Sequence, residues 1–195
     1  VSRTTNVPWF VIAVIHSLES GLSFRGHLHN GDPLTARTVQ VPAGRPSTGS
    51  PPFAWETSAI DALTMKGLNE ITDWSIERIG YELERYNGWG YRLYHPTTLS
   101  PYLWSFSNHY RAGKYVADGK WSATAVSEQC GAMVLLKRLE ALGHITIGAR
   151  PEPAPIPRQR PTEPVPPPPD VSPPEQGKPA TGLLAWFLRL LAKLW

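Results

Sequence analysis

The chain has 195 residues, and 21 of them are proline, about twice the roughly 5% share of ordinary globular proteins. Hydrophobic residues make up 41% and aromatic residues 10% of the chain, which excludes a wholly disordered protein. A disulfide scaffold is excluded too, because Cys130 is the one cysteine in the chain. The formal net charge of +3 forms no basic stripe along the sequence, so we expect no nucleic-acid partner.

Most of the prolines lie in one segment. Between Pro151 and Pro179 there are 13 prolines in 29 residues. Such a segment lacks backbone donors and favours an extended polyproline II spacer, although a ligand of an SH3-type domain has the same composition. We therefore predict three parts: a folded domain over 1–148, a Pro-rich disordered linker over 149–181 and a short tail over 182–195.

A buried central helix is predicted at the start of the chain, ending near residue 20. Asn6 lies at or near its N-cap, Pro8 suits its first turn, and Gly21 suits the position past its C-terminus. Apolar residues surround this segment on nearly every side, which indicates burial. The apolar run also resembles part of a signal peptide, but the usual basic flank and small-residue cleavage site are missing.

Glu19 lies at the end of this apolar helix. If the helix end is buried, desolvation raises the pKa of Glu19 and suits it to general acid catalysis; alternatively, Glu19 is exposed and pairs with Arg25. Asp32 follows thirteen residues later in the turn-rich segment 23–35. Two carboxylates across a cleft are what glycoside hydrolysis requires, but Asp32 could also simply cap its own turn.

The histidines of the same segment could be considered as metal ligands. His27 and His29 alternate along a loop, with Asp32 nearby and His16 on the helix. This spacing matches no established zinc site, so we predict neither a metal nor a cofactor.

Further elements follow along the chain. We expect a brief strand over 36–41, helices over 55–63 and 75–85, and a long last helix over 122–142 in which Cys130 is a small buried residue. Residues 94–121 are dense in aromatic side chains and irregular in pattern, which is typical of a loop that covers a core or lines a groove.

Two short motifs resemble the lysozyme superfamily. The run Glu19-Ser20-Gly21-Leu22-Ser23-Phe24 is similar to the Glu-Ser-x-x-Ser-Phe motif of lytic transglycosylases and goose-type lysozymes. The run Tyr86-Asn87-Gly88 is similar to the Tyr-Asn-Gly or Tyr-Asn-Ala turn of the same families. Together with residues 29–34 and 100–104, these motifs resemble phage and bacterial lysozyme-family muramidases over about residues 7–143.

The resemblance implies a mostly α, lysozyme-like domain with a small β-hairpin or irregular cleft loop. It implies a peptidoglycan hydrolase of the cell envelope, periplasm or a phage, with Glu19 as catalytic acid and Asp32 as second carboxylate. Asp61 and Asp73 are other possible bases. The residues expected to contact the glycan are His29, Thr38, Tyr86, Asn87, Tyr91, Tyr102, Trp104, Asn108, His109 and Tyr110.

Two other functions remain open at this point. A lytic transglycosylase needs no second carboxylate, because the substrate's own hydroxyl attacks and an anhydro product leaves. A cell-wall-binding or phage structural module would keep the cleft without turnover.

The tail over 182–195 is apolar and helix-prone. Arg189 and Lys193 are four residues apart and share one helix face, while Trp186 and Trp195 suit a membrane interface. We expect an amphipathic helix that associates peripherally with a membrane surface; folding back onto the domain or self-association are the alternatives.

Overall fold

The computed structural model describes residues 1–117 and 119–148, all within the first of the two units into which the chain divides, Val1–Pro155. The predictions for the linker over 149–181 and the tail over 182–195 lie outside the described residues. The described part is mostly helical with a small two-stranded antiparallel sheet, as the sequence predicts.

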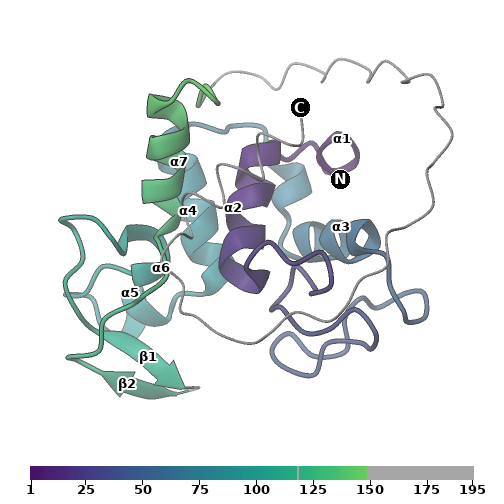
Figure 1. Ribbon diagram of the computed structural model, residues 1–195, viewed down its shortest axis with the longest axis horizontal. Coiled ribbons are helices and arrows are strands. Elements are labelled where there is room, and N and C mark those ends of the chain that lie inside the picture. The colour runs from purple at the N-terminus through teal and green to yellow at the C-terminus, as the bar shows by residue number, and fades with distance from the viewer. Residues whose placement is uncertain (118, 149–195) are drawn as a thin grey trace, which may run out of the picture. The chain divides into compact units, whose positions relative to one another are not determined.

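Helix α2, Trp9–Ser20, lies in the middle of the fold, and its prediction is confirmed (Figure 1). Pro8 is its N-cap, and Gly21 ends it in the left-handed conformation with φ 58°. The predicted N-cap role of Asn6 is wrong. Asn6 adopts φ 59° and ends the preceding short helix α1, Ser2–Thr5, because its amide donates to the carbonyl of Ser2.

Two groups of helices cover α2 (Figure 1). On one side lies α3, Trp55–Met65, against which α1 packs. On the other lies α7, Ala132–Ala141, which packs against α2, against α4, Ile76–Asn87, and against the short α6, Pro101–Trp104. Ile15, Ile79 and Leu136 are fully buried where these helices meet. Each such side chain contributes about 1.5–3 kcal/mol to folding.

The helices over 55–63 and 75–85 are confirmed as α3 and α4. A 3-10 turn, Leu68–Glu70, joins them, and the short α5, Gly90–Tyr94, follows α4.

The last helix begins ten residues later than predicted, at Ala132 instead of Ser122. The backbone of the intervening segment bonds to the aromatic loop: the carbonyl of Ala125 accepts from Gly113, and the amide of Gly131 donates to Ser105. Cys130 therefore precedes the helix. It is half-buried rather than fully buried, and burial raises the pKa of its thiol.

The sheet is a hairpin of β1, Lys114–Ala117, and β2, Lys120–Ser122. Tyr115 pairs with Trp121, and the register shifts after that pair. The strand predicted over 36–41 is wrong. That segment is irregular, because the amides of Val39 and Gln40 donate to the carboxylate of Asp32 instead of to a neighbouring strand.

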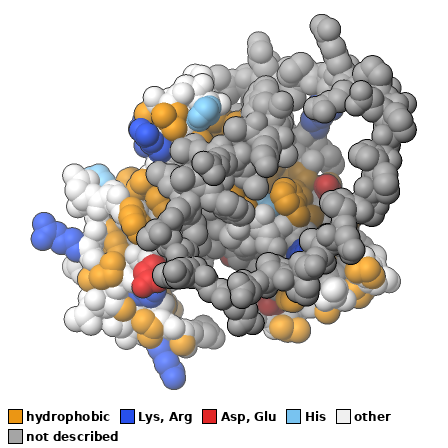
Figure 2. All heavy atoms as spheres, viewed as in Figure 1, with side chains coloured by type: hydrophobic (Ala, Val, Ile, Leu, Met, Phe, Trp, Pro, Cys, Tyr) orange, Lys and Arg blue, Asp and Glu red, His pale blue; other side chains and the backbone are white. Residues whose placement is uncertain are grey.

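Figure 2 shows one face of the molecule, where Lys and Arg side chains of the described part project separately at the edges. Hydrophobic side chains lie between them in several places. Within residues 1–117 and 119–148, no helix is long and apolar enough to cross a membrane.

Candidate active site

The residues after Glu19 turn the chain sharply at the end of α2. The amides of Gly21 and Leu22 donate to the carbonyls of Ser17 and His16, and both Gly21 and Leu22 have positive φ. The buried ring of His16 then holds the carbonyl of Ser23 at 3.1 Å from Nε2. The chain is thus directed back toward the carboxylate-bearing end of the helix.

The loop that follows is packed directly on this helix end. Gly31 has φ 79°, and a Cβ there would lie 2.4 Å from the carbonyl oxygen of Glu19. Only glycine fits this approach. The sequence neighbour of Gly31 is Asp32, so both predicted catalytic carboxylates belong to segments that touch.

Glu19 is partly buried, and no ion pair between the described residues joins it to Arg25. Burial raises the pKa of Glu19 from 4.5 to about 7, opposed by a hydrogen bond from Tyr102 and by the positive charge of Lys66. The hydroxyl of Tyr102 donates to Oε1 of Glu19 over 2.9 Å. A carboxyl group with this pKa is about half protonated near neutral pH, as a general acid needs to be.

Lys66 and Tyr86 also lie close enough to Glu19 to interact with its charge. The ammonium of Lys66 donates to the carbonyl of Tyr86 over 2.7 Å and lies 5.1 Å from the centre of its ring. The buried hydroxyl of Tyr86 donates to the carbonyl of Leu28 over 2.7 Å, which ties α4 to the loop after α2. Burial and the charge of Glu19 raise the pKa of Tyr86, so its hydroxyl stays protonated.

Tyr102 lines a pocket of about 330 Å³. Tyr102 connects it with Glu19, and Gln129 connects it with the same helix end, because its amide donates to the carbonyl of Leu18 over 2.6 Å. The lining consists of Asn87, Gly88, Gly90, Tyr91, Pro101, Tyr102, Lys114, Tyr115, Ser127 and Gln129. Of the predicted glycan contacts, Asn87, Tyr91 and Tyr102 are therefore brought together in one pocket, which Tyr102 connects with Glu19.

Asp32 is buried and accepts several hydrogen bonds. Its Oδ2 accepts from the amides of Val39 and Gln40, at 2.8 and 3.0 Å, and from the side chain of Asn30. Burial raises the pKa of Asp32, but these bonds outweigh it and hold the pKa below its ordinary value. Oδ1 accepts only a longer bond, 3.3 Å from the Gln40 side chain, and so keeps capacity for a further donor.

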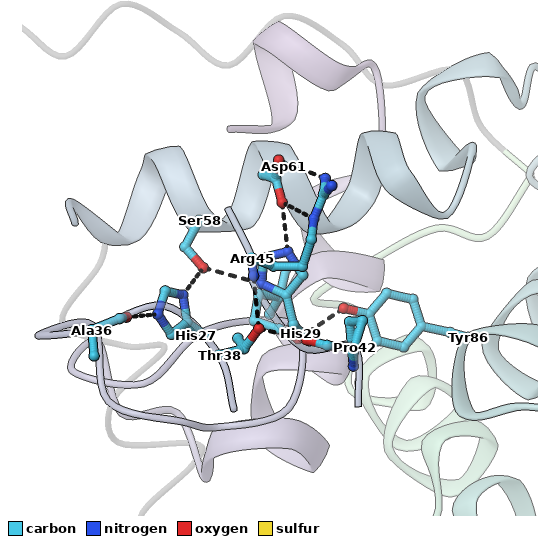
Figure 3. A network of polar contacts seen from close by, with 10 residues as sticks. His27, His29, Ala36, Thr38, Pro42, Arg45, Ser58, Asp61 and Tyr86 are labelled. Atoms are coloured by element: carbon cyan, nitrogen blue, oxygen red, sulfur yellow. Dashed lines mark hydrogen bonds and ion pairs between the residues drawn. The ribbon is translucent and has the colours of Figure 1, made fainter. Parts of the chain in front are cut away.

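His29 belongs to a buried polar network under the same loop (Figure 3). Its Nε2 lies 2.8 Å from Oδ2 of Asp61, and Arg45 donates two hydrogen bonds to that carboxylate. Ser58 on α3 lies between His29 and His27, and His27 also contacts the carbonyl of Ala36. The polar groups of His29 and Asp61 are therefore occupied in anchoring the loop to α3.

Two more of the predicted glycan contacts are buried within loops. The hydroxyl of Thr38 donates to the carbonyl of Pro42 and accepts from the amide of Arg45. The hydroxyl of Tyr110 donates to Gly113 and accepts from the amide of Ser127. These groups hold loop backbone in place.

The remaining predicted contacts lie elsewhere. Trp104 lines a second, more apolar pocket of about 890 Å³, and its ring meets that of His109 edge-on at 5.0 Å. Asn108 and His109 are exposed. Asp73, considered as a base, accepts hydrogen bonds from Ser75 at the start of α4.

Sequence reasoning missed Lys66, Lys114, Ser127 and Gln129. The pattern over 122–142 predicts Ser127 and Gln129 on a helix, but that helix begins only at Ala132. The sequence signal that points to the later start is Gly131, since glycine is one of the residues found at helix N-caps. In the structure Gly131 is that N-cap, and a Cβ there would lie 2.4 Å from the carbonyl oxygen of Leu103.

In the described part of the chain, no group of three or more His, Cys, Asp and Glu side chains is arranged to hold a metal ion. Comparisons with protein-family models, with curated proteins and with solved structures yield no match to the chain.

Proposed function

We propose that the protein is a peptidoglycan-cleaving glycosidase of the cell envelope or of phage origin, a muramidase that breaks the bond between N-acetylmuramic acid and N-acetylglucosamine. The observation that carries this proposal is Glu19: burial raises its pKa to about 7, and its hydrogen-bond partner Tyr102 lines a pocket.

In the first step Glu19 donates its proton to the glycosidic oxygen as the bond to the anomeric carbon breaks. The leaving sugar takes that proton as its new hydroxyl hydrogen. Tyr102 stabilises the carboxylate that forms, because its hydroxyl already donates to Oε1. Burial and the charge of Glu19 raise the pKa of Tyr102, so this hydroxyl remains a donor.

In the second step water attacks the anomeric carbon and loses one proton. Asp32 is the proposed acceptor, and Oδ1 is the oxygen that keeps hydrogen-bonding capacity for that water. Its depressed pKa keeps Asp32 ionised near neutral pH, but also makes it a weak base.

A lytic transglycosylase is the second candidate, favoured by the hydrogen bonds on Asp32. If those bonds reserve Asp32 for the loop, the substrate's own hydroxyl attacks the anomeric carbon instead. Glu19, deprotonated by the first step, then takes the proton of that hydroxyl. The product differs from the hydrolysis product by one water.

The test is release of soluble fragments from purified peptidoglycan by the wild type and by Glu19→Gln. We expect release by the wild type and a loss of at least about 100-fold in the variant, as for removal of a general acid. Equal release by the two proteins would exclude Glu19 as the acid. Mass analysis of the fragments then separates reducing ends from anhydro ends, and hence hydrolysis from transglycosylation.

A further inference from the structure

The pocket beside Glu19 contains a cation that has no counter-ion among residues 1–117 and 119–148. Lys114, the first residue of β1, is half-buried, and it takes part in none of the ion pairs between described residues. It is also the one charged side chain among the described residues that line this pocket.

The other polar side chains of the pocket are neutral. Asn87, Ser127 and Gln129 line the same pocket, together with the phenols of Tyr102 and Tyr115. Tyr115 packs over Gly90, where a Cβ would lie 3.6 Å from its ring. The hydroxyl of Tyr102 already donates to Glu19, and the side-chain amide of Gln129 already donates to Leu18. The pocket therefore offers one positive charge together with the side-chain amide of Asn87, which is chemistry that recognises a carboxylate.

We propose that this pocket binds a carboxylate of the substrate, and that Lys114 is the residue that selects acidic over neutral glycan strands. The inference rests on the proposed function, whose substrate it narrows. Tyr102 and Gln129 place the pocket next to the end of α2, so a carboxylate held there belongs to a sugar close to the bond that Glu19 protonates.

A muramyl residue can present a carboxylate in two ways. When the peptide stem is attached, the lactyl carboxyl is an amide and the carboxylates are those of the stem. When the stem has been removed, the lactyl carboxylate itself is free. Both sources share the same chemistry, so the experiment has to separate them.

The experiment measures binding of soluble glycan strands in the Glu19→Gln background, so that turnover does not interfere. Three strands are compared: strands with peptide stems, strands stripped of stems, and stripped strands whose carboxylates are converted to neutral methylamides. The variants are Lys114→Gln, Lys114→Arg and Lys120→Gln. Lys120 is the matched control, because it is an exposed lysine on β2 of the same hairpin and does not line the pocket.

We expect Lys114→Gln to weaken binding of acidic strands about fivefold at low salt, a strong effect for a partly exposed charge pair, and less at high salt. Binding of the methylamide strands should not change, Lys114→Arg should retain most of the affinity, and Lys120→Gln should match the parent protein. If Lys114→Gln loses affinity only for strands with stems, the site binds a stem carboxylate. If it loses affinity only for stripped strands, the site binds the lactyl carboxylate.

The inference is overturned if Lys114→Gln affects acidic and neutral strands equally, if it behaves like Lys120→Gln, or if no strand binds. Fragment release by the otherwise wild-type protein is measured in parallel on the same acidic strands. If the protein releases fragments but Lys114→Gln does not change strand binding, the proposed function stands and the carboxylate site is refuted. If strand binding depends on Lys114 but no fragments are released, the proposed enzymatic function is refuted and the carboxylate site stands.

Discussion

The raised pKa of Glu19 makes a prediction about stability that does not depend on the substrate. Burial raises this pKa from 4.5 to about 7 in the folded protein. The carboxyl group therefore contributes stability that is fully present below about pH 4.5 and is lost as the pH rises through about 7. At about 1.36 kcal/mol per pH unit, the difference amounts to about 3 kcal/mol.

Replacing Glu19 by Gln removes this titration and keeps an oxygen that can accept from Tyr102. We expect Glu19→Gln to gain about 3 kcal/mol of unfolding free energy relative to the wild type between about pH 4 and about pH 8. Urea unfolding of the full chain at both pH values measures it. Glu56→Gln is the control, since Glu56 is exposed on α3 and water still solvates it. A stability difference between Glu19→Gln and the wild type that stays constant with pH would refute the reasoning.

Three further substitutions test the contacts around Glu19. Tyr102→Phe removes the hydrogen bond that lowers the pKa of Glu19, so this pKa should rise. The alkaline limb of the pH profile of fragment release should then move up by about one pH unit, and an unchanged limb would contradict this. Gly31→Ala should destabilise the fold by more than Gly21→Ala, measured by urea unfolding, because both have positive φ but only Gly31 abuts a backbone carbonyl. Tyr86→Phe leaves a buried carbonyl without its donor and should cost about 1–3 kcal/mol in thermal unfolding; a neutral effect would mean that another donor replaces it.

The central helix could be predicted from the sequence because its signals are local. The apolar run, Pro8 at its start and Gly21 past its end each depend on neighbouring residues alone. The same signals place Glu19 at the end of an apolar helix, but they leave open whether its carboxylate is buried or exposed. The structure shows it partly buried.

The pocket could not be predicted, because its walls come from distant parts of the chain. Gln129 bonds to Leu18 across 111 residues, and Tyr102 bonds to Glu19 across 83. The apolar pattern over 122–142 predicts a helix throughout, but the residues before Ala132 are not helical. Their backbone forms hydrogen bonds with the aromatic loop instead. A tertiary contact of this kind overrides local propensity and leaves no periodic trace in the sequence.

Several aromatic and polar residues that the sequence predicts at the glycan form hydrogen bonds within or beneath the loops. His29, Thr38 and Tyr110 carry groups that can bind a sugar, but the same groups can bond to buried backbone or to Asp61. Residue type does not distinguish these uses. A loop as long as 22–53 has many backbone groups to satisfy, and its polar side chains are the nearest partners.

The position of Glu19 is unfavourable for stability in two ways, and both favour acid catalysis. The C-terminus of a helix carries partial negative charge, so a cation is the stabilising choice there, yet the last turn of α2 holds no basic residue. Burial also disfavours the carboxylate through desolvation and raises the pKa of Glu19. The hydrogen bond from the Tyr102 hydroxyl and the charge of Lys66 lower this pKa. A carboxyl group that served structure alone would be more stable paired or exposed. Stabilisation of the fold by Glu19→Gln at alkaline pH, together with loss of fragment release, is therefore the joint result expected of a site that trades stability for reactivity. Stabilisation with full release would assign the proton transfer to another group.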